Sequence, residues 1–303
     1  MSEPAHEPEV PVELRPVGST VAGDGPGDDS ELFDVAAQPR LRAYLRQLWA
    51  YREFAITIPL GQLRARSQHT SLGRAWYLLN PLLLIAIYYA IFEVVLGIES
   101  RRGVPDYLPF LTVGVIVYSY TRSTVQSGAT SLTASQRLVR SLRFPRTILP
   151  FGVMVAQTST HLYAIAVLLV ALIPMGQFPS WRWLLLPVAL LLQGTINLGL
   201  TMYAARLTFT FPDLTNLLPF MLRLGLYVSG VLIPINAELI TNDLVRTILQ
   251  LNPIYNVLEI HRQLLLGYPH DAWPWIASVS WAVLLLVTSS IYFRAAEDRY
   301  ASG

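Results

Sequence analysis

Two ionisable residues, Arg223 and Glu93, lie inside long apolar stretches of this 303-residue chain. If those stretches cross a bilayer, each charge costs roughly 3 kcal/mol or more at mid-depth and is expected to face a cavity or a partner. One hypothesis is that Arg223 lines a route for an anionic or polar molecule. The alternative is a structural ion pair, because with a rise of about 1.5 Å per helical residue the two depths differ by a distance that an arginine side chain can bridge.

Aromatic residues are concentrated in the same apolar stretches. Sugar rings can stack their C–H faces on aromatic rings, so a row of aromatics could form a slide for sugars. The alternative is that these rings pack against neighbouring helices or face lipid. The candidate channel-lining residues are Tyr88, Tyr89, Phe92, Tyr118, Tyr120, Arg223 and Tyr227.

Motifs for enzymatic or metal chemistry are missing from the sequence. There is no G-x-x-x-x-G-K-[ST] phosphate-binding loop, no G-x-S-x-G nucleophile elbow and no H-E-x-x-H zinc pair. The absence of cysteine removes disulfides, thiolate metal sites and cysteine nucleophiles. The histidines His69, His161, His261 and His270 stand alone, so we expect packing or hydrogen-bonding roles for them. The sequence therefore predicts a non-enzyme that binds no metal or cofactor itself.

The composition places these residues in a membrane protein. The chain is 53% hydrophobic and 14% charged, whereas an ordinary soluble chain is about 25% charged. A helix needs roughly 20 apolar residues to span the hydrocarbon core. Six stretches qualify and predict an all-α, polytopic fold with six transmembrane helices. They cover about residues 78–97, 107–128, 148–174, 182–206, 214–234 and 273–293.

Charge is unevenly distributed between the two ends of the chain. Residues 1–38 carry nine acidic residues and one arginine, which together with several prolines and glycines predicts a disordered tail. Residues 39–303 are expected to form one membrane domain. With the N-terminus inside, fifteen arginines flank the cytoplasmic ends of the spans and five flank the outer ends, as the positive-inside rule demands. We expect a multi-pass plasma-membrane protein with both termini cytoplasmic and no cleavable signal peptide.

Three further segments have apolar residues at helical spacing but are not expected to cross the membrane. Residues 41–54 predict an amphipathic helix that rests in the membrane interface. Residues 131–144 predict a short basic helix that ends before Pro145. The alternative for both is that they only satisfy the arginine bias. Residues 235–272 predict two short re-entrant helices, on either side of Asn252-Pro253, that dip into the outer leaflet.

Three segments, in this order along the chain, resemble signatures of one family. "TSLGRAWYLLNPLLL" resembles its approach to the first span, "RLVRSLRFPRTILP" its Phe-Pro-Arg loop and "LNPIYNVLEIHRQLLLG" its Asn-Pro segment. The family is the membrane subunit of ATP-driven polysaccharide exporters of the O-antigen, capsule and teichoic-acid type, often called Wzm-like. The resemblance covers roughly residues 40–295. Three departures concern the substrate. Pro212 stands where the family commonly has arginine, Arg223 stands where it usually has an uncharged residue, and the basic run before Leu72-Gly73 is looser than usual.

The resemblance implies a division of labour between two proteins. Members are homodimers whose twelve spans enclose a channel, and each dimer works with two copies of a separate ATPase subunit that binds ATP and magnesium. By analogy, the helix over residues 131–144 is the main coupling element and the helix over residues 41–54 is the second contact. The expected coupling residues are Leu45, Trp49, Arg137, Arg140, Arg143, Phe144, Pro145 and Arg146.

The resemblance also suggests a function for residues 64–74, where the sequence changes from polar to apolar. This segment is expected at the cytoplasmic lipid surface, where a polyprenyl-linked sugar presents its pyrophosphate. Arginine suits that group because its planar fork can bond phosphate oxygens in two places, and glycine permits a sharp turn into the membrane. The candidate entrance residues are Arg64, Arg66, Leu72, Gly73 and Arg74. The alternative is that these arginines are ordinary interfacial residues.

The sequence thus predicts the membrane subunit of a bacterial exporter that moves a polyprenyl-pyrophosphate-linked polysaccharide outward, amid membrane lipids and without nucleic acid. All 22 basic residues are arginine, which indicates high-GC coding; in an actinobacterium, the cell-wall galactan would be a candidate cargo. Two rivals remain. One is a permease of the same broad class for a drug or a simple lipid. The other is a membrane glycosyltransferase, for which Asp28-Asp29 in the acidic tail would be the metal-binding candidate.

Overall fold

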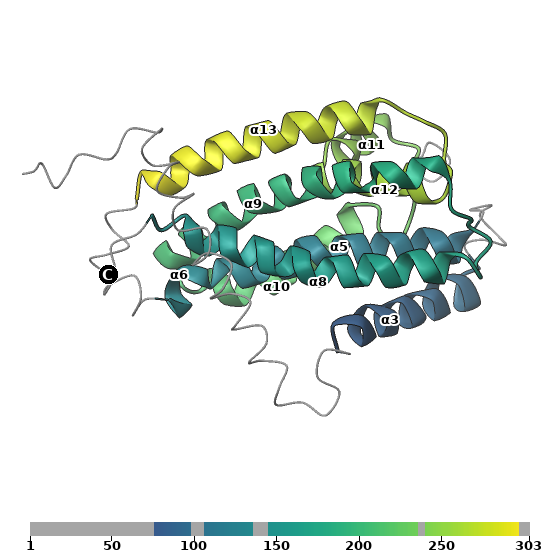
Figure 1. Cartoon of the computed structure of the whole chain (residues 1–303), viewed down its shortest axis with the longest axis horizontal. Helices are drawn as coiled ribbons and strands as arrows, with labels where there is room; N and C mark the ends of the chain where they lie inside the picture. Colours follow the sequence, from purple (N-terminus) through teal and green to yellow (C-terminus); the bar gives the residue numbers. More distant parts are fainter. Residues whose placement is uncertain (1–75, 98–105, 136–144, 236–239, 297–303) are drawn as a thin grey trace, which may run out of the picture. The chain divides into compact units, whose positions relative to one another are not determined.

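The computed structural model describes residues 76–97, 106–135, 145–235 and 240–296, and every regular element in these ranges is a helix (Figure 1). This confirms the all-α prediction for the described part of the chain. The elements are α3 (Trp76–Tyr89), the π-helix η3 (Ala90–Val95), α5 (Tyr107–Ala129), α6 (Ser131–Ala134), α8 (Ile148–Leu172), the 3-10 helix η4 (Trp181–Leu185), α9 (Leu186–Thr210), α10 (Leu214–Val228), α11 (Asp243–Gln250), α12 (Pro253–Leu265) and α13 (Trp273–Arg294).

Three of these helices are long and apolar enough to cross a membrane: α8, the continuous pair η4–α9, and α13. Two shorter apolar segments, Leu82–Val95 and Leu214–Val228, accompany them. Helix α5 has 23 residues but is less apolar, and most of its side chains are buried inside the protein. Each predicted span therefore coincides with a helix, and three of the six have the length and composition of a span on their own.

Helix α5 lies at the centre of the bundle. It packs against α9, α8, α12, α3 and α10, while α9 also packs along α13; Figure 1 shows α13, α9 and α5 running side by side. Lipid gives helices little hydrophobic reason to associate, so close packing through small residues holds them together. A Cβ added at Gly199 of α9 would lie 2.8 Å from the Leu285 Cβ of α13, so this crossing leaves no room for a larger residue.

The fifth predicted span is shorter than expected. The sequence predicted residues 214–234, but α10 ends at Val228. Gly230 has a φ of +67°, which ends the helix in a left-handed turn. The following Val231 and Leu232 are buried outside any helix, and the Tyr107 hydroxyl donates a hydrogen bond to the Leu232 carbonyl at 2.9 Å. Fifteen helical residues extend about 22 Å, so α10 is shorter than a bilayer core is thick.

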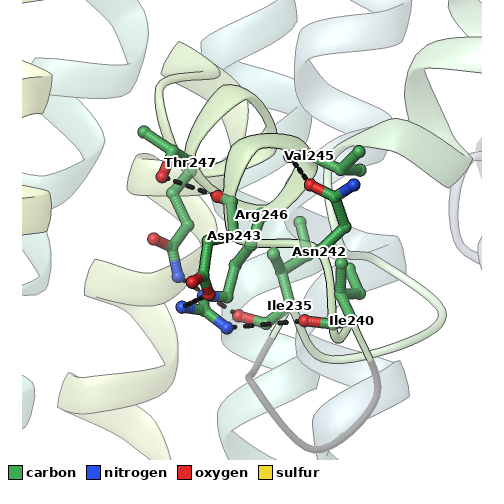
Figure 2. A network of polar contacts seen from close by, with 8 residues as sticks. Ile235, Ile240, Asn242, Asp243, Val245, Arg246 and Thr247 are labelled. Atoms are coloured by element: carbon green, nitrogen blue, oxygen red, sulfur yellow. Dashed lines mark hydrogen bonds and ion pairs between the residues drawn. The ribbon is translucent and has the colours of Figure 1, made fainter.

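The segment after α10 contains the two short helices that the sequence predicted on either side of Asn252-Pro253. Asn242 begins α11 by accepting a hydrogen bond from the Val245 amide, and Asn252 begins α12 by accepting one from Ile254. Figure 2 shows Arg246 of α11 directed toward the Asp243 carboxylate and the Ile240 carbonyl. The second helix is largely buried against α5, α9 and α13.

Several predicted elements lie outside the described residues. They are the acidic tail over residues 1–38, the amphipathic helix over residues 41–54, and most of the basic helix over residues 131–144. Of this last helix the structure describes only the first turn, as α6.

Candidate functional site

Four polar side chains lie on three helices that pack together, because α5 contacts both α3 and α10. They are Tyr88 of α3, Arg122 of α5, and Arg223 and Tyr227 of α10, which we call the arginine–tyrosine strip. The Tyr88 hydroxyl interacts electrostatically with the Tyr227 hydroxyl and with both guanidinium groups. Arg223 and Tyr227 are exposed, and Arg122 and Tyr88 are half-buried.

A hydrogen bond between α5 and α10 positions the strip. The Tyr118 hydroxyl donates to the Leu222 carbonyl, which brings these two helices together immediately beside Arg223. Arg122 follows Tyr118 by one helical turn and so lies on the same side of α5. Gly225 permits the approach, since a Cβ there would lie 2.7 Å from the Tyr118 hydroxyl oxygen.

The predicted channel-lining residues fall into two groups. Tyr118 and Tyr120 are buried inside the protomer, where their hydroxyl groups bond to Leu222 and Thr158. The remaining members, Tyr88, Tyr89, Phe92, Arg223 and Tyr227, are half-buried or exposed. The structure therefore shows Tyr118 and Tyr120 as residues that join helices, and a lining role stays a prediction for the set. Arg122 was not among the channel-lining candidates predicted from the sequence. Its position four residues after Tyr118, on the same side of a helix, could have identified it.

The alternative ion pair between Arg223 and Glu93 is not formed. Among the described residues, the ion pairs join Arg246 to Asp243 and Arg262 to Glu259. Glu93 instead contributes to the electrostatic surroundings of Tyr107, at the other end of α5 from Arg122.

Arg262 of α12 forms the most heavily bonded charged site in the described ranges. Its side chain is fully buried, and its guanidinium carbon lies 3.5 Å from the centroid of the Phe110 ring. Nη2 donates to the carbonyls of Gly230 and Val231 at 2.9 and 3.3 Å, and Nη1 pairs with the Glu259 carboxylate at 2.9 Å. Arg262 therefore ties α12 to α5 and to the turn after α10. In the sequence, Arg262 is one of the five arginines expected at the outer ends of the spans and belongs to the Asn-Pro segment of the family resemblance, and neither feature predicts this anchoring role.

A second buried polar cluster lies where α5, α8 and α9 meet. The Tyr120 ring stacks on His161 with centroids 4.5 Å apart. Gln193 donates to the Val117 carbonyl at 2.9 Å and to Thr121 at 3.2 Å. Within the described part of the chain, several neighbouring buried polar atoms have no hydrogen-bond partner, among them both amide atoms of Asn197 and His161 Nε2. The ring stacking and the two hydrogen bonds of Gln193 therefore join α5, α8 and α9 at this cluster.

His261 is the other buried histidine, and its Nδ1 lies 2.8 Å from the Val257 carbonyl. Burial lowers the pKa of the His261 imidazole to about 4, so the ring is neutral at physiological pH. The ring stacking of His161 and the hydrogen-bond contact of His261 agree with the packing or hydrogen-bonding roles that the sequence predicted.

The entrance and coupling candidates mostly lie outside the described residues. These are Leu45, Trp49, Arg64, Arg66, Leu72, Gly73, Arg74, Arg137, Arg140, Arg143 and Phe144. Pro145 and Arg146 are described. Their carbonyls accept hydrogen bonds from the amides of Ile148 and Leu149, both at 3.1 Å, and so form the turn that begins α8.

The helical bundle and the matched sequence together define a transport protein of the ABC class. Residues 58–266 match the ABC-2 type transporter membrane family, and the chain belongs to this family. It is 30% identical over 261 residues to the O-antigen export system permease protein RfbA of Myxococcus xanthus, an alignment that covers 85% of this chain and 97% of the relative. A permease of the same name from Klebsiella pneumoniae is 26% identical over 181 residues, covering 59% of this chain and 68% of the relative. The chain is therefore a transport subunit and not an enzyme.

Proposed function

We propose that two copies of this chain form the membrane part of an exporter that moves a polyprenyl-pyrophosphate-linked polysaccharide outward across the bacterial plasma membrane. Two copies of a separate ATPase subunit would supply the energy. The main support is the relative from Myxococcus xanthus, which bears the name of an O-antigen export permease and aligns over 97% of its length.

The proposed topology has six spans with both termini in the cytoplasm. The three long apolar helices supply spans three, four and six. Helices α3 and η3 together have 20 residues and extend about 30 Å, and α5 has the length for the second span. The burial of α5 at the centre of the bundle explains its lower hydropathy, because lipid contacts little of it. Helix α10 is the short fifth span.

The position of the arginine–tyrosine strip favours a conduit between two protomers. Arg223 is exposed near the middle of α10, and the helix surface around it is apolar, including Phe220 and Leu224. Facing hydrocarbon would cost an arginine several kcal/mol, so this face is expected to contact water or a second copy. A closed two-fold dimer, which is the commonest form of homo-oligomer, would place this face against a second copy and around a water-filled conduit.

The coupling to ATP is proposed for the segment before α8. Basic side chains over residues 137–146 would dock in the ATPase subunit, which holds ATP and magnesium, and residues 41–54 would form a second contact. Closure of the ATPase pair would then move these elements as rigid bodies. The entrance arginines Arg64, Arg66 and Arg74 would receive the pyrophosphate at the cytoplasmic surface.

Reconstitution of this chain with its ATPase partner tests the proposal. The two proteins are purified separately and together, placed in liposomes containing a polyprenyl-pyrophosphate-linked glycan, and assayed for ATP hydrolysis and for glycan accessible to an added lectin. We expect both activities only in the joint complex. Sugar transfer by this chain alone would support a glycosyltransferase, and transport of a simple lipid without a prenyl carrier would support the other class of permease.

A further inference from the structure

We infer that the arginine–tyrosine strip is a binding site for a pyrophosphate group, inside the conduit and separate from the entrance arginines. This inference rests on the proposed function, because it assigns the strip to the lipid-linked cargo during its passage. Its four members are Tyr88, Arg122, Arg223 and Tyr227.

The first argument is the unmatched charge of the two arginines. Neither Arg122 nor Arg223 forms an ion pair or a hydrogen bond with any part of the chain that the structure describes. Arg262, by contrast, is an arginine used for packing. It is fully buried and bonded to one carboxylate and two carbonyls. Arg122 is half-buried and Arg223 is exposed on the neighbouring helix, so both charges are open to an anion from outside the described chain.

The second argument is the chemistry of the four side chains. Each guanidinium is a planar fork of N–H donors that matches phosphate oxygens, and each tyrosine hydroxyl adds one donor. The strip therefore offers two positive charges and two hydroxyl groups from α3, α5 and α10. A single carboxylate is satisfied by one arginine, whereas a pyrophosphate has the charge and the oxygens to engage both.

The third argument is the depth of the strip. Arg122 lies seven residues before the end of α5, and Arg223 lies nine residues after the start of α10. At about 1.5 Å per residue, the two guanidinium groups are roughly 10 to 14 Å along their helices from the ends that the proposed topology places at the cytoplasm. Phospholipid head groups stay at the surface, so a phosphate reaches this depth only inside a conduit. The strip would thus hold the pyrophosphate after it leaves the entrance.

A binding measurement on the full-length chain in nanodiscs of neutral phosphatidylcholine tests the inference. Arg64, Arg66 and Arg74 are all changed to glutamine, so that the entrance does not contribute. The probe is geranylgeranyl pyrophosphate, and geranylgeraniol is the uncharged control. We expect the pyrophosphate to bind, the alcohol to bind at least about tenfold more weakly, and inorganic pyrophosphate to compete.

Substitutions in the strip separate this site from unspecific binding. Arg122→Gln and Arg223→Gln should each weaken probe binding by about tenfold or more, since each removes a charge-assisted hydrogen bond. Arg223→Lys keeps the charge but loses the planar fork, so it should weaken probe binding less than Arg223→Gln does. Arg246→Gln is the matched control, because Arg246 lies on α11 and pairs with Asp243. This variant should bind the probe with unchanged affinity.

Four results would overturn the site. They are no probe binding once the entrance arginines are removed, normal binding by both glutamine variants, loss of the dimer in those variants, and displacement of the probe by phosphatidylglycerol. Loss of the dimer would mean that the arginines face the second copy, and displacement would identify a lipid head group as the ligand. The liposome assay of glycan export is an independent measurement. If the glutamine variants export glycan and bind the probe normally, the strip is not the binding site, but the proposed export function stands. Probe binding through the strip without glycan export rejects only the proposed function.

Discussion

The guanidinium of Arg262 lies over the Phe110 ring, with its central carbon 3.5 Å from the ring centroid. This contact connects α12 with α5, and the same guanidinium holds the carbonyls of Gly230 and Val231 in the turn after α10. A cation over an aromatic face in a desolvated site is worth about 2 kcal/mol. One side chain therefore fixes three segments that are far apart in the sequence.

We predict that Arg262→Gln lowers the free energy of unfolding by about 3 kcal/mol. The change removes the cation from the Phe110 ring, leaves two buried carbonyls without their donor and leaves Glu259 unpaired. Thermal unfolding in detergent, followed by the loss of monodisperse protein, measures the effect. Arg246→Gln is the control, because its partner Asp243 is exposed and such pairs contribute at most about 1 kcal/mol. Equal shifts for the two variants would contradict the role given to Arg262.

Gly128 of α5 is expected to tolerate no larger residue. An added Cβ would overlap the Thr201 methyl group of α9, so Gly128→Ala should destabilise the protein by about 1 to 3 kcal/mol. Thr201→Ser removes that methyl group and should restore most of the loss in the double variant. Gly194→Ala is the matched control on α9, since its Cβ would meet the Tyr120 hydroxyl at 3.4 Å and the Met154 sulfur at 3.9 Å, which are ordinary contact distances. If the double variant unfolds at the same temperature as Gly128→Ala, the contact with the Thr201 methyl group is not the cause of the destabilisation.

The packing of α10 on α5 should depend on Gly225 and Tyr118 as a pair. Gly225→Ala would place a Cβ 2.7 Å from the Tyr118 hydroxyl oxygen and displace the bond to Leu222. We expect a loss of about 1 to 3 kcal/mol. Tyr118→Phe alone should cost about 1 kcal/mol for the lost hydrogen bond. The double variant should cost less than the sum of the two, because the second change removes the clash; additive shifts in thermal unfolding would argue against this geometry.

The sequence predicts the helices well because their ends are marked by composition. Apolar runs of spanning length predicted residues 148–174 and 273–293, and the structure has helices at Ile148–Leu172 and Trp273–Arg294. It did not predict the end of α10, because residues 229–234 are as apolar as the helix before them. Only the left-handed conformation at Gly230 ends the helix, and hydropathy carries no signal for it.

The candidate site was predicted only in part, for a different reason. Arg223 and Tyr227 became candidates because a charge and an aromatic ring inside an apolar run are visible in the sequence. The contribution of Arg122 and the anchoring role of Arg262 depend on which way each helix is rotated. Spans that are apolar all round give little information about rotation. The burial of Tyr118 likewise follows from the packing of α10 on α5, which no local pattern encodes.

His161 offers a test of whether the buried polar cluster acts through packing. Its ring stacks on Tyr120 with an interplanar angle of 9°, while its Nε2 has no hydrogen-bond partner among the described residues. His161→Phe keeps an aromatic ring on Tyr120 and removes a buried polar atom that makes no hydrogen bond. We therefore expect unfolding at the same or a higher temperature. His161→Ala leaves a cavity beside Tyr120 and should lower the free energy of unfolding by about 2 to 4 kcal/mol. A large loss in the phenylalanine variant would instead show that the Nε2 atom holds an internal water molecule that the cluster needs.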